Sequence, residues 1–238
     1  MSAWNGVKAV YGKEMMSYFR SPIAYFVIAV FLLGTGYFFT YNIFLTGVGT
    51  MDQTFQNMGI LLVVLVPVLT MRLFSGEYTG RTMELLMTLP LRTWQVVLGK
   101  YLGAVSILAL MVAFSCINLV PLYLFGNPQT PNIIAGYLGF LLLGMACIAI
   151  GQLFSALTEN QIVAALITIP TLLLFWFIGF LQTLQSSVLL RDLFAHLSFS
   201  LHYADFIHGL LRSEAIVYFL VVAGLALTLN TSYLQWRR

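Results

Sequence analysis

The stretch ILLVVLVPVL, residues 60–69, consists of apolar residues only, and it decides the class of fold. A second run, AIVYFLVVAGLAL at residues 215–227, is equally uniform. Strands of a membrane β-barrel alternate apolar with polar residues, whereas these runs are apolar on every side, as a lipid-facing helix is. We therefore predict an all-α membrane protein.

The composition extends this prediction to the whole chain. Its 238 residues are 60% hydrophobic and 8% charged, and the mean hydropathy is +0.92. Soluble proteins use about 45–50% apolar residues. The net charge of +3 is spread without a basic tract, so nucleic acid is not an expected partner. Cys116 and Cys147 lie in apolar runs, where a free thiol acts as a small buried hydrophobe.

Six segments are long and apolar enough to cross a bilayer, which requires about 20 residues in a helix. The expected spans are residues 23–44, 55–71, 101–125, 133–157, 162–184 and 215–234. Together with their connections they predict a single transmembrane domain over residues 1–238.

Two further helical segments are expected outside the spans. In residues 1–21 an amphipathic helix should lie in the membrane interface, because apolar side chains recur there at helical spacing and Pro22 follows. The apolar residues on that face are Trp4, Val7, Tyr11, Met15 and Tyr18. Residues 185–214 have room for two short extracytoplasmic or re-entrant helices before the last span.

The positive charges predict the topology. Nine of the eleven Lys and Arg residues lie in the N-terminal segment, the loop 72–100 and the C-terminus, and only Arg191 and Arg212 lie on the opposite side. Because cytoplasmic loops hold the excess of Lys and Arg, both termini should be cytoplasmic. We expect a multi-pass protein of the bacterial cytoplasmic (inner) membrane, in contact with lipid.

Prolines interrupt two of the spans. Pro67 in the second and Pro170 in the fifth should kink their helices and leave carbonyls free for a neighbour or a cavity. With Thr70, Thr168 and Thr171 they are the candidates for lining a pathway. By contrast, a stripe of small residues in the fourth span is expected to allow close helix packing. The stripe consists of Gly144, Cys147, Gly151 and Ser155.

The segment 75–100, SGEYTGRTMELLMTLPLRTWQVVLGK, concentrates charge in one loop. Glu77 and Arg81 are four residues apart, and Arg81 and Glu84 three, so on a helix each could pair with the next. The apolar face between them, which ends before Pro90, predicts a protein partner. An ordinary interfacial helix is the alternative.

The run EYTGRTMELLMTLP, residues 77–90, with Gly99-Lys100 nine residues beyond its proline, resembles the cytoplasmic loop of ABC-2 type transporter permeases. The six spans, the N-terminal helix and the segment 198–219 extend the resemblance over essentially the whole chain. The most similar groups are the gliding-motility and nitrous-oxide-reductase-maturation permeases.

This resemblance implies that Gly80 to Leu89 is a coupling helix that docks in a groove of a cytosolic ABC ATPase dimer. The chain would then be the permease subunit of an ABC transporter that uses ATP hydrolysis for export, paired with a second copy or with a homologous permease, possibly one with an extracytoplasmic domain. The implied coupling residues are Glu77, Gly80, Arg81, Glu84, Leu85, Leu86, Met87 and Pro90.

The chain shows no nucleotide-binding motif of its own. Gly99-Lys100 is followed by Tyr101, and Trp94 stands where a phosphate-binding loop needs its first glycine. We therefore expect no cofactor in this chain and no enzyme activity, with ATP and Mg bound by the partner ATPase.

Two other functions remain open at this stage. One is a membrane subunit that transmits force or anchors an ATP-driven envelope machine without moving a solute. The other, weaker, is an intramembrane enzyme, for which His202, Asp205 and His208 are the only suggestive group. Their spacing matches no common zinc motif, so no catalytic or metal site is predicted.

Overall fold

The computed structural model describes residues 3–46, 51–83, 91–125, 129–182 and 188–237, and within these ranges it contains helices and no strand. The all-α prediction is confirmed. The long helices of the bundle are α2 (Pro22–Thr46), α3 (Asp52–Thr70), α6 (Thr93–Ser115), α8 (Thr130–Leu157), α9 (Gln161–Leu181) and α12 (Ser213–Trp236). The shorter helices are α1 (Ala3–Arg20), α4 (Ser75–Thr79), α7 (Leu119–Phe125), α10 (Val188–Leu197) and α11 (Phe199–Ile207).

Six helical segments are long and apolar enough to cross a membrane, as the hydropathy predicts. The third of them differs in its bounds. It begins at Thr93 rather than at residue 101, and a 3-10 turn at Cys116–Asn118 joins α6 to α7. The expectation that residues 93–100 belong to the loop is therefore wrong. They are helical because α1 covers them: a methyl carbon on Gly99 would lie 2.7 Å from Val10 Cβ.

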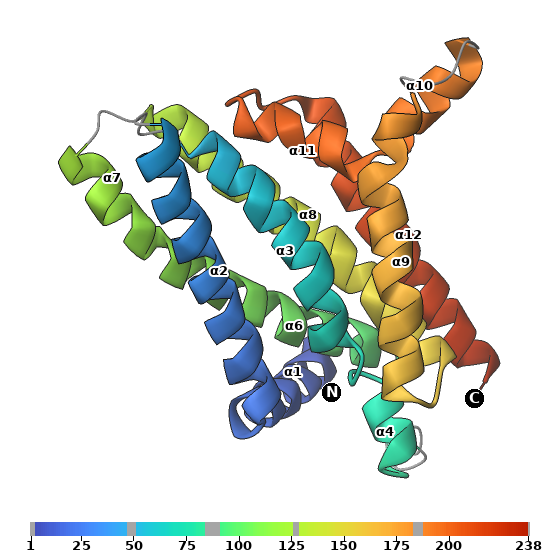
Figure 1. Ribbon diagram of the computed structural model, residues 1–238. Helices are drawn as coiled ribbons and strands as arrows, with labels where there is room; N and C mark the ends of the chain where they lie inside the picture. Colours follow the sequence, from blue (N-terminus) through green and yellow to red (C-terminus); the bar gives the residue numbers. More distant parts are fainter. Residues whose placement is uncertain (1–2, 47–50, 84–90, 126–128, 183–187, 238) are drawn as a thin grey trace.

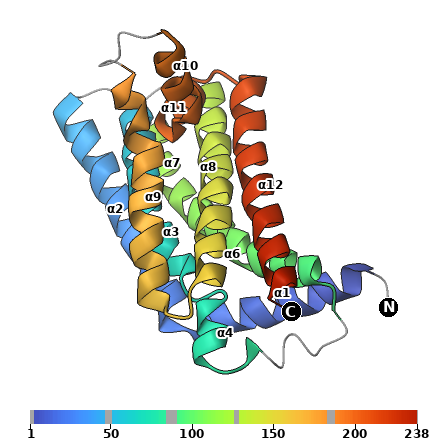
Figure 2. The same ribbon diagram turned by 90° about the vertical axis from the view of Figure 1, so that its right-hand side faces the viewer.

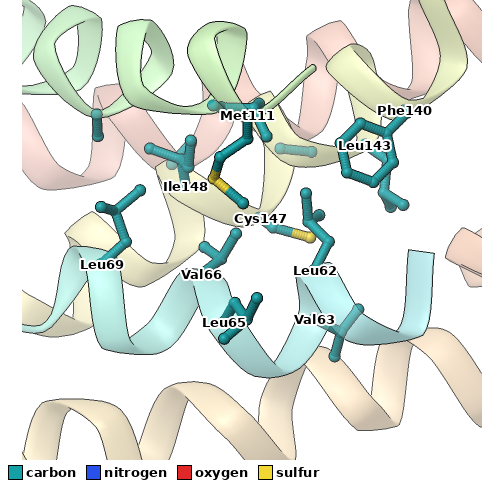
Figure 3. Packing of buried hydrophobic residues seen from close by; sticks show 14 of the residues in the cluster. Leu62, Val63, Leu65, Val66, Leu69, Met111, Phe140, Leu143, Cys147 and Ile148 are labelled. Carbon is teal, nitrogen blue, oxygen red and sulfur yellow. The ribbon is translucent and has the colours of Figure 1, made fainter. Parts of the chain in front are cut away.

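Helices α3 and α8 form the centre of the bundle (Figure 1). In each, 67% of the most apolar stretch is buried, against 28–33% in the other four spans. Figure 3 shows Leu62, Val66 and Leu69 of α3 packed toward Cys147 of α8 and Met111 of α6. Cys147 is a free, fully buried thiol, in agreement with its predicted role as a small hydrophobe.

The small residues of α8 permit close approach of its neighbours. A methyl carbon on Gly144 would lie 2.4 Å from a methyl group of Leu108, and one on Gly151 would lie 2.2 Å from Thr70 Oγ1. Such distances leave no space for a larger side chain. The predicted packing stripe is thus present, with α6 on one part of it and α3 on another.

Helix α1 lies across the end of the bundle, beneath the long helices in Figure 2. Its buried face is formed by Val7, Val10, Glu14 and Tyr18. The predicted face included Trp4, which is 65% exposed. That face was predicted to lie in the membrane interface, and this stays a prediction; on the buried face, Glu14 pairs with Lys100 of α6.

The segment before the last span forms two short helices, α10 and α11, as expected from its length. Helix α11 packs among the spans, and Phe199, Tyr203 and Phe206 are fully buried. Helices α1 and α4 and the C-terminal end of α12 lie at one end of the bundle, with α10 and α11 at the other (Figure 1).

Candidate functional site

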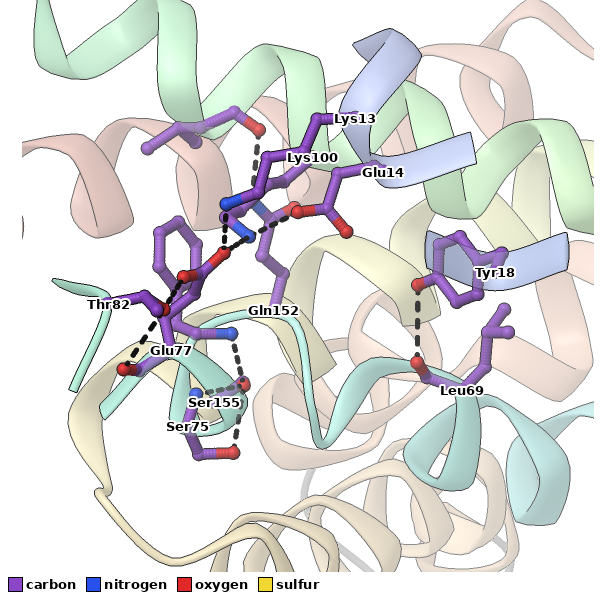
Figure 4. Close-up of polar contacts among 12 residues, drawn as sticks. Lys13, Glu14, Tyr18, Leu69, Ser75, Glu77, Thr82, Lys100, Gln152 and Ser155 are labelled. Carbon is purple, nitrogen blue, oxygen red and sulfur yellow. Dashed lines mark hydrogen bonds and ion pairs between the residues drawn. The ribbon is translucent and has the colours of Figure 1, made fainter. Parts of the chain in front are cut away.

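Four charged side chains meet where α1, α4 and α6 come together (Figure 4). Lys100 Nζ forms ion pairs with Glu14 and, at 3.2 Å, with Glu77 Oε1. Lys13 Nζ lies 2.8 Å from the same oxygen of Glu77. The Lys100 ammonium also lies 5.4 Å from the ring centroid of Phe74. We call Lys13, Glu14, Glu77 and Lys100 the loop-anchoring cluster.

The inner members of this cluster are almost out of reach of water. Lys100 has 2% of its side chain exposed, Glu14 9% and Glu77 11%, whereas Lys13 is 53% exposed. A buried lysine needs carboxylate partners, since an isolated charge in a low-dielectric interior is costly. The cluster therefore holds α4 against both α1 and α6.

A second contact holds the start of α4 on α8. Ser155 Oγ accepts hydrogen bonds from the backbone N–H groups of Phe74 at 3.0 Å and Ser75 at 3.2 Å. It donates one to the carbonyl oxygen of Met71 at 2.9 Å. Backbone N–H groups at a helix start have no partner within the helix, so this buried hydroxyl takes the place of a cap. The start and the middle of α4 are thus tied to the transmembrane core.

The helix α4 ends at Thr79, and Arg81 has a left-handed conformation with φ of 54°. The N–H of Thr82 donates to the carbonyl of Glu77 at 3.0 Å, and that of Arg81 to the carbonyl of Tyr78 at 3.1 Å. This pattern is a Schellman motif, which terminates a helix. The prediction that a helix begins at Gly80 is therefore wrong for Gly80 and Arg81, which form the turn after α4.

The predicted ion pair between Glu77 and Arg81 is wrong for the same reason. The left-handed turn interrupts the helical spacing on which the pair depends, and Arg81 is exposed. Glu77 is instead bound by Lys100 and Lys13, with the hydroxyl of Thr82 donating to its other oxygen.

The remaining predicted coupling residues lie outside the described part of the chain. They are Glu84, Leu85, Leu86, Met87 and Pro90. Glu77, Gly80 and Arg81 lie directly before them, on α4 and its terminal turn, so the loop-anchoring cluster is at the entrance to the predicted coupling segment.

The pathway candidates lie on α3 and α9, which continue through Pro67 and Pro170 respectively. Thr70 and Thr168 are buried, and Thr171 is half-buried. Each threonine hydroxyl donates to the carbonyl four residues earlier in its own helix, at 2.7 to 2.9 Å. Thr70 adjoins Gly151 of α8, while Pro170 is exposed. Their role in lining a pathway stays a prediction.

Of His202, Asp205 and His208, which lie on and just after α11, the first two have local partners. His202 stacks on Tyr218 with ring centroids 4.0 Å apart, and its Nδ1 lies 2.8 Å from the carbonyl oxygen of Ser198. Asp205 lies 3.6 Å from the guanidinium of Arg212. Across the described ranges, no three His, Cys, Asp or Glu residues come together as metal ligands would.

Sequence reasoning missed Glu14 and the position of Lys100. Lys100 was treated as the end of a loop, although it lies within α6 and contacts two acids from other helices. The signal that could have found Glu14 was its register with Val7, Val10 and Tyr18, since an acid on an apolar helix face calls for a buried basic partner.

The fold and composition define the chain as a multi-pass, all-helical membrane protein. Residues 41–210 match the family described as ABC-2 family transporter protein, and the chain belongs to that family. A comparison with curated proteins found no match. The chain is accordingly a permease component of an ABC transporter, and such a component is not itself catalytic.

Proposed function

We propose that this chain couples ATP hydrolysis by a separate cytosolic ATPase dimer to export across the bacterial inner membrane. ATP and Mg would bind in that partner, and a second permease, identical or homologous, would complete the transporter. Both termini and α4 would face the cytoplasm, because most of the Lys and Arg residues lie at that end.

The observation that carries this proposal is the loop-anchoring cluster. It connects α4, which leads into the predicted coupling segment 80–89, with α6, which is part of a span. A displacement of that segment by a closing ATPase would act on α4. The ion pairs of Glu77 and the contacts of Ser155 would then pass the movement to α6 and α8.

The proposal is tested with two kinds of variant in the complete transporter. Leu86→Asp or Glu84→Ala should leave expression and topology normal and reduce copurification of the ATPase, because each alters the predicted docking surface. The expected loss of docking energy is on the order of 1–3 kcal/mol. Glu77→Gln should leave the ATPase bound and weaken the coupling between ATP hydrolysis and transport.

The matched control is Asp52→Ala. It removes a carboxylate at the start of α3, whereas α4 follows the other end of α3. It should change neither ATPase association nor coupling. Wild-type association together with fully coupled activity in Leu86→Asp would contradict the proposed function.

A further inference from the structure

An open basic groove lies beside Ser21, which joins α1 to α2 and which we call the elbow. The groove is on the surface next to the loop-anchoring cluster. Its volume is about 710 Å³. The charged side chains that line it are all basic: Lys13 and Arg20 from α1, and Arg72 from the turn after α3. A smaller cavity of about 180 Å³ shares Lys13 and Arg72 with it and continues inward to Lys100.

The charges of this region do not cancel. The two cavities are lined by four basic side chains and by two acidic ones, Glu14 and Glu77. Both acids are already bound by Lys100 and Lys13. Neither Arg20 nor Arg72 has a carboxylate within ion-pair distance in the ranges that the structure describes. The groove therefore has a positive charge available for an anion.

Arg72 is held so that it presents this charge at a defined place. Its Nη1 donates a hydrogen bond to Ser21 Oγ at the elbow, and its side chain is half-buried. The hydroxyl of Ser21 accepts from the N–H of Ile23 at 3.3 Å, which connects the arginine to the first turn of α2. Arginine in a fixed position is well suited to binding a phosphate.

The surroundings of the groove are those of the membrane boundary. Met16 lines it with 55% of its surface exposed, and Phe19, Tyr25 and Phe26 beside the elbow are exposed by 48–62%. The Tyr25 hydroxyl donates to the carbonyl of Phe19 at 3.0 Å. Aromatic residues of this kind concentrate at the level of lipid headgroups. A ligand here would meet basic groups and apolar surface together.

We infer that this groove binds the phosphate of an anionic membrane lipid, with Arg20 and Arg72 on the headgroup and the acyl chains along the exposed side of α2. Basic pockets at the cytoplasmic ends of transmembrane helices bind anionic headgroups in this way. The inference does not depend on coupling to an ATPase, and a free phosphate ion is the other source of the same chemistry.

The test measures binding of fluorescently labelled phosphatidylglycerol to the full-length chain in detergent. Unlabelled phosphatidylglycerol should displace the probe, whereas phosphatidylcholine or inorganic phosphate at the same concentration should not. One basic residue near a membrane surface contributes about 1 kcal/mol, so Arg20→Gln should weaken binding roughly fivefold and Arg20→Gln with Arg72→Gln roughly 25-fold. Arg20→Lys, which keeps the charge, should bind within about twofold of the unmodified chain.

The matched control is Lys8→Gln, which removes one charge from an exposed position of α1 that lines neither cavity. It should change the affinity by less than about twofold. Equal weakening by Lys8→Gln, or equal affinity for phosphatidylcholine, would overturn the inference in favour of unspecific binding. Displacement by inorganic phosphate would overturn it in favour of a soluble anion. Because Arg20 is exposed, its single variant decides the matter even if the Arg72 change prevents folding.

Discussion

At the scale of single residues, Lys100 is the most informative side chain in the molecule. It lies in a transmembrane segment and is almost completely buried, and it contacts two acids from different parts of the chain. Removing the basic partner would leave Glu14 and Glu77 buried without it, a costly arrangement. The stability of the end of the bundle near α4 should therefore depend on this one charge.

We expect Lys100→Met to lower the free energy of unfolding by about 3–5 kcal/mol, the range for breaking a buried ion pair from one side. Lys13→Met removes a charge from the same cluster at a 53% exposed position, so its cost should be about 0–1 kcal/mol. Unfolding by denaturant in mixed micelles measures both. Adding Glu14→Gln to Lys100→Met should recover part of the loss. Equal effects of the two single variants would mean that burial of the cluster is unimportant.

At the scale of elements, the contact of α8 with α3 depends on the absence of a side chain. Gly151 faces Thr70, whose hydroxyl is already bonded to the carbonyl of Val66 at 2.9 Å. Since helices in lipid gain little from hydrophobic burial against one another, such close contacts carry much of their association. Ser155 of α8 also binds the start of α4, so the position of α8 helps to determine the position of α4.

Gly151→Ala should destabilise the bundle by about 1–3 kcal/mol, because its methyl group overlaps Thr70 Oγ1 and the two helices must separate. Gly224→Ala in α12 is the control. Apart from its chain neighbours and the backbone of its own helix, no atom lies within 4 Å of the added methyl group. That change should be neutral or stabilising by up to about 1 kcal/mol. Thermal unfolding of the two variants in detergent compares them. An unchanged midpoint for Gly151→Ala would contradict close packing at this contact.

At the scale of the whole molecule, the two ends of the bundle differ in charge and in architecture. One end holds α1, α4 and the C-terminal end of α12, with most of the Lys and Arg residues, and the other holds α10 and α11 (Figure 1). This asymmetry is what the proposed orientation requires: the ATPase would contact the first end, and the exit would lie at the second.

Cysteine labelling tests this orientation in a chain whose native cysteines are replaced. Thr79→Cys, at the exposed end of α4, should be protected from a membrane-impermeant thiol reagent added outside intact cells. Gln129→Cys, exposed before α8, should react with it. Both should react after the membrane is permeabilised. Labelling of Thr79→Cys in intact cells would reverse the topology.

The sequence by itself determined the class of fold, the six spans and the asymmetry of charge. These are local properties, because a run such as residues 60–69 can satisfy its backbone in lipid only as a helix. The sequence also predicted the small-residue stripe of α8, since helical spacing alone places Gly144 and Gly151 on one face.

Only the tertiary structure decided what those helices meet. Glu14 and Lys100 are separated by 86 residues. The local sequence around either residue does not reveal that the other is its partner in an ion pair. Likewise, the spacing of Glu77 and Arg81 suggested an ion pair, but competing basic residues from α1 and α6 took the carboxylate and the chain turned at Arg81. Ion pairs and close contacts depend on distances between helices. These distances cannot be derived from the spacing of residues along one helix.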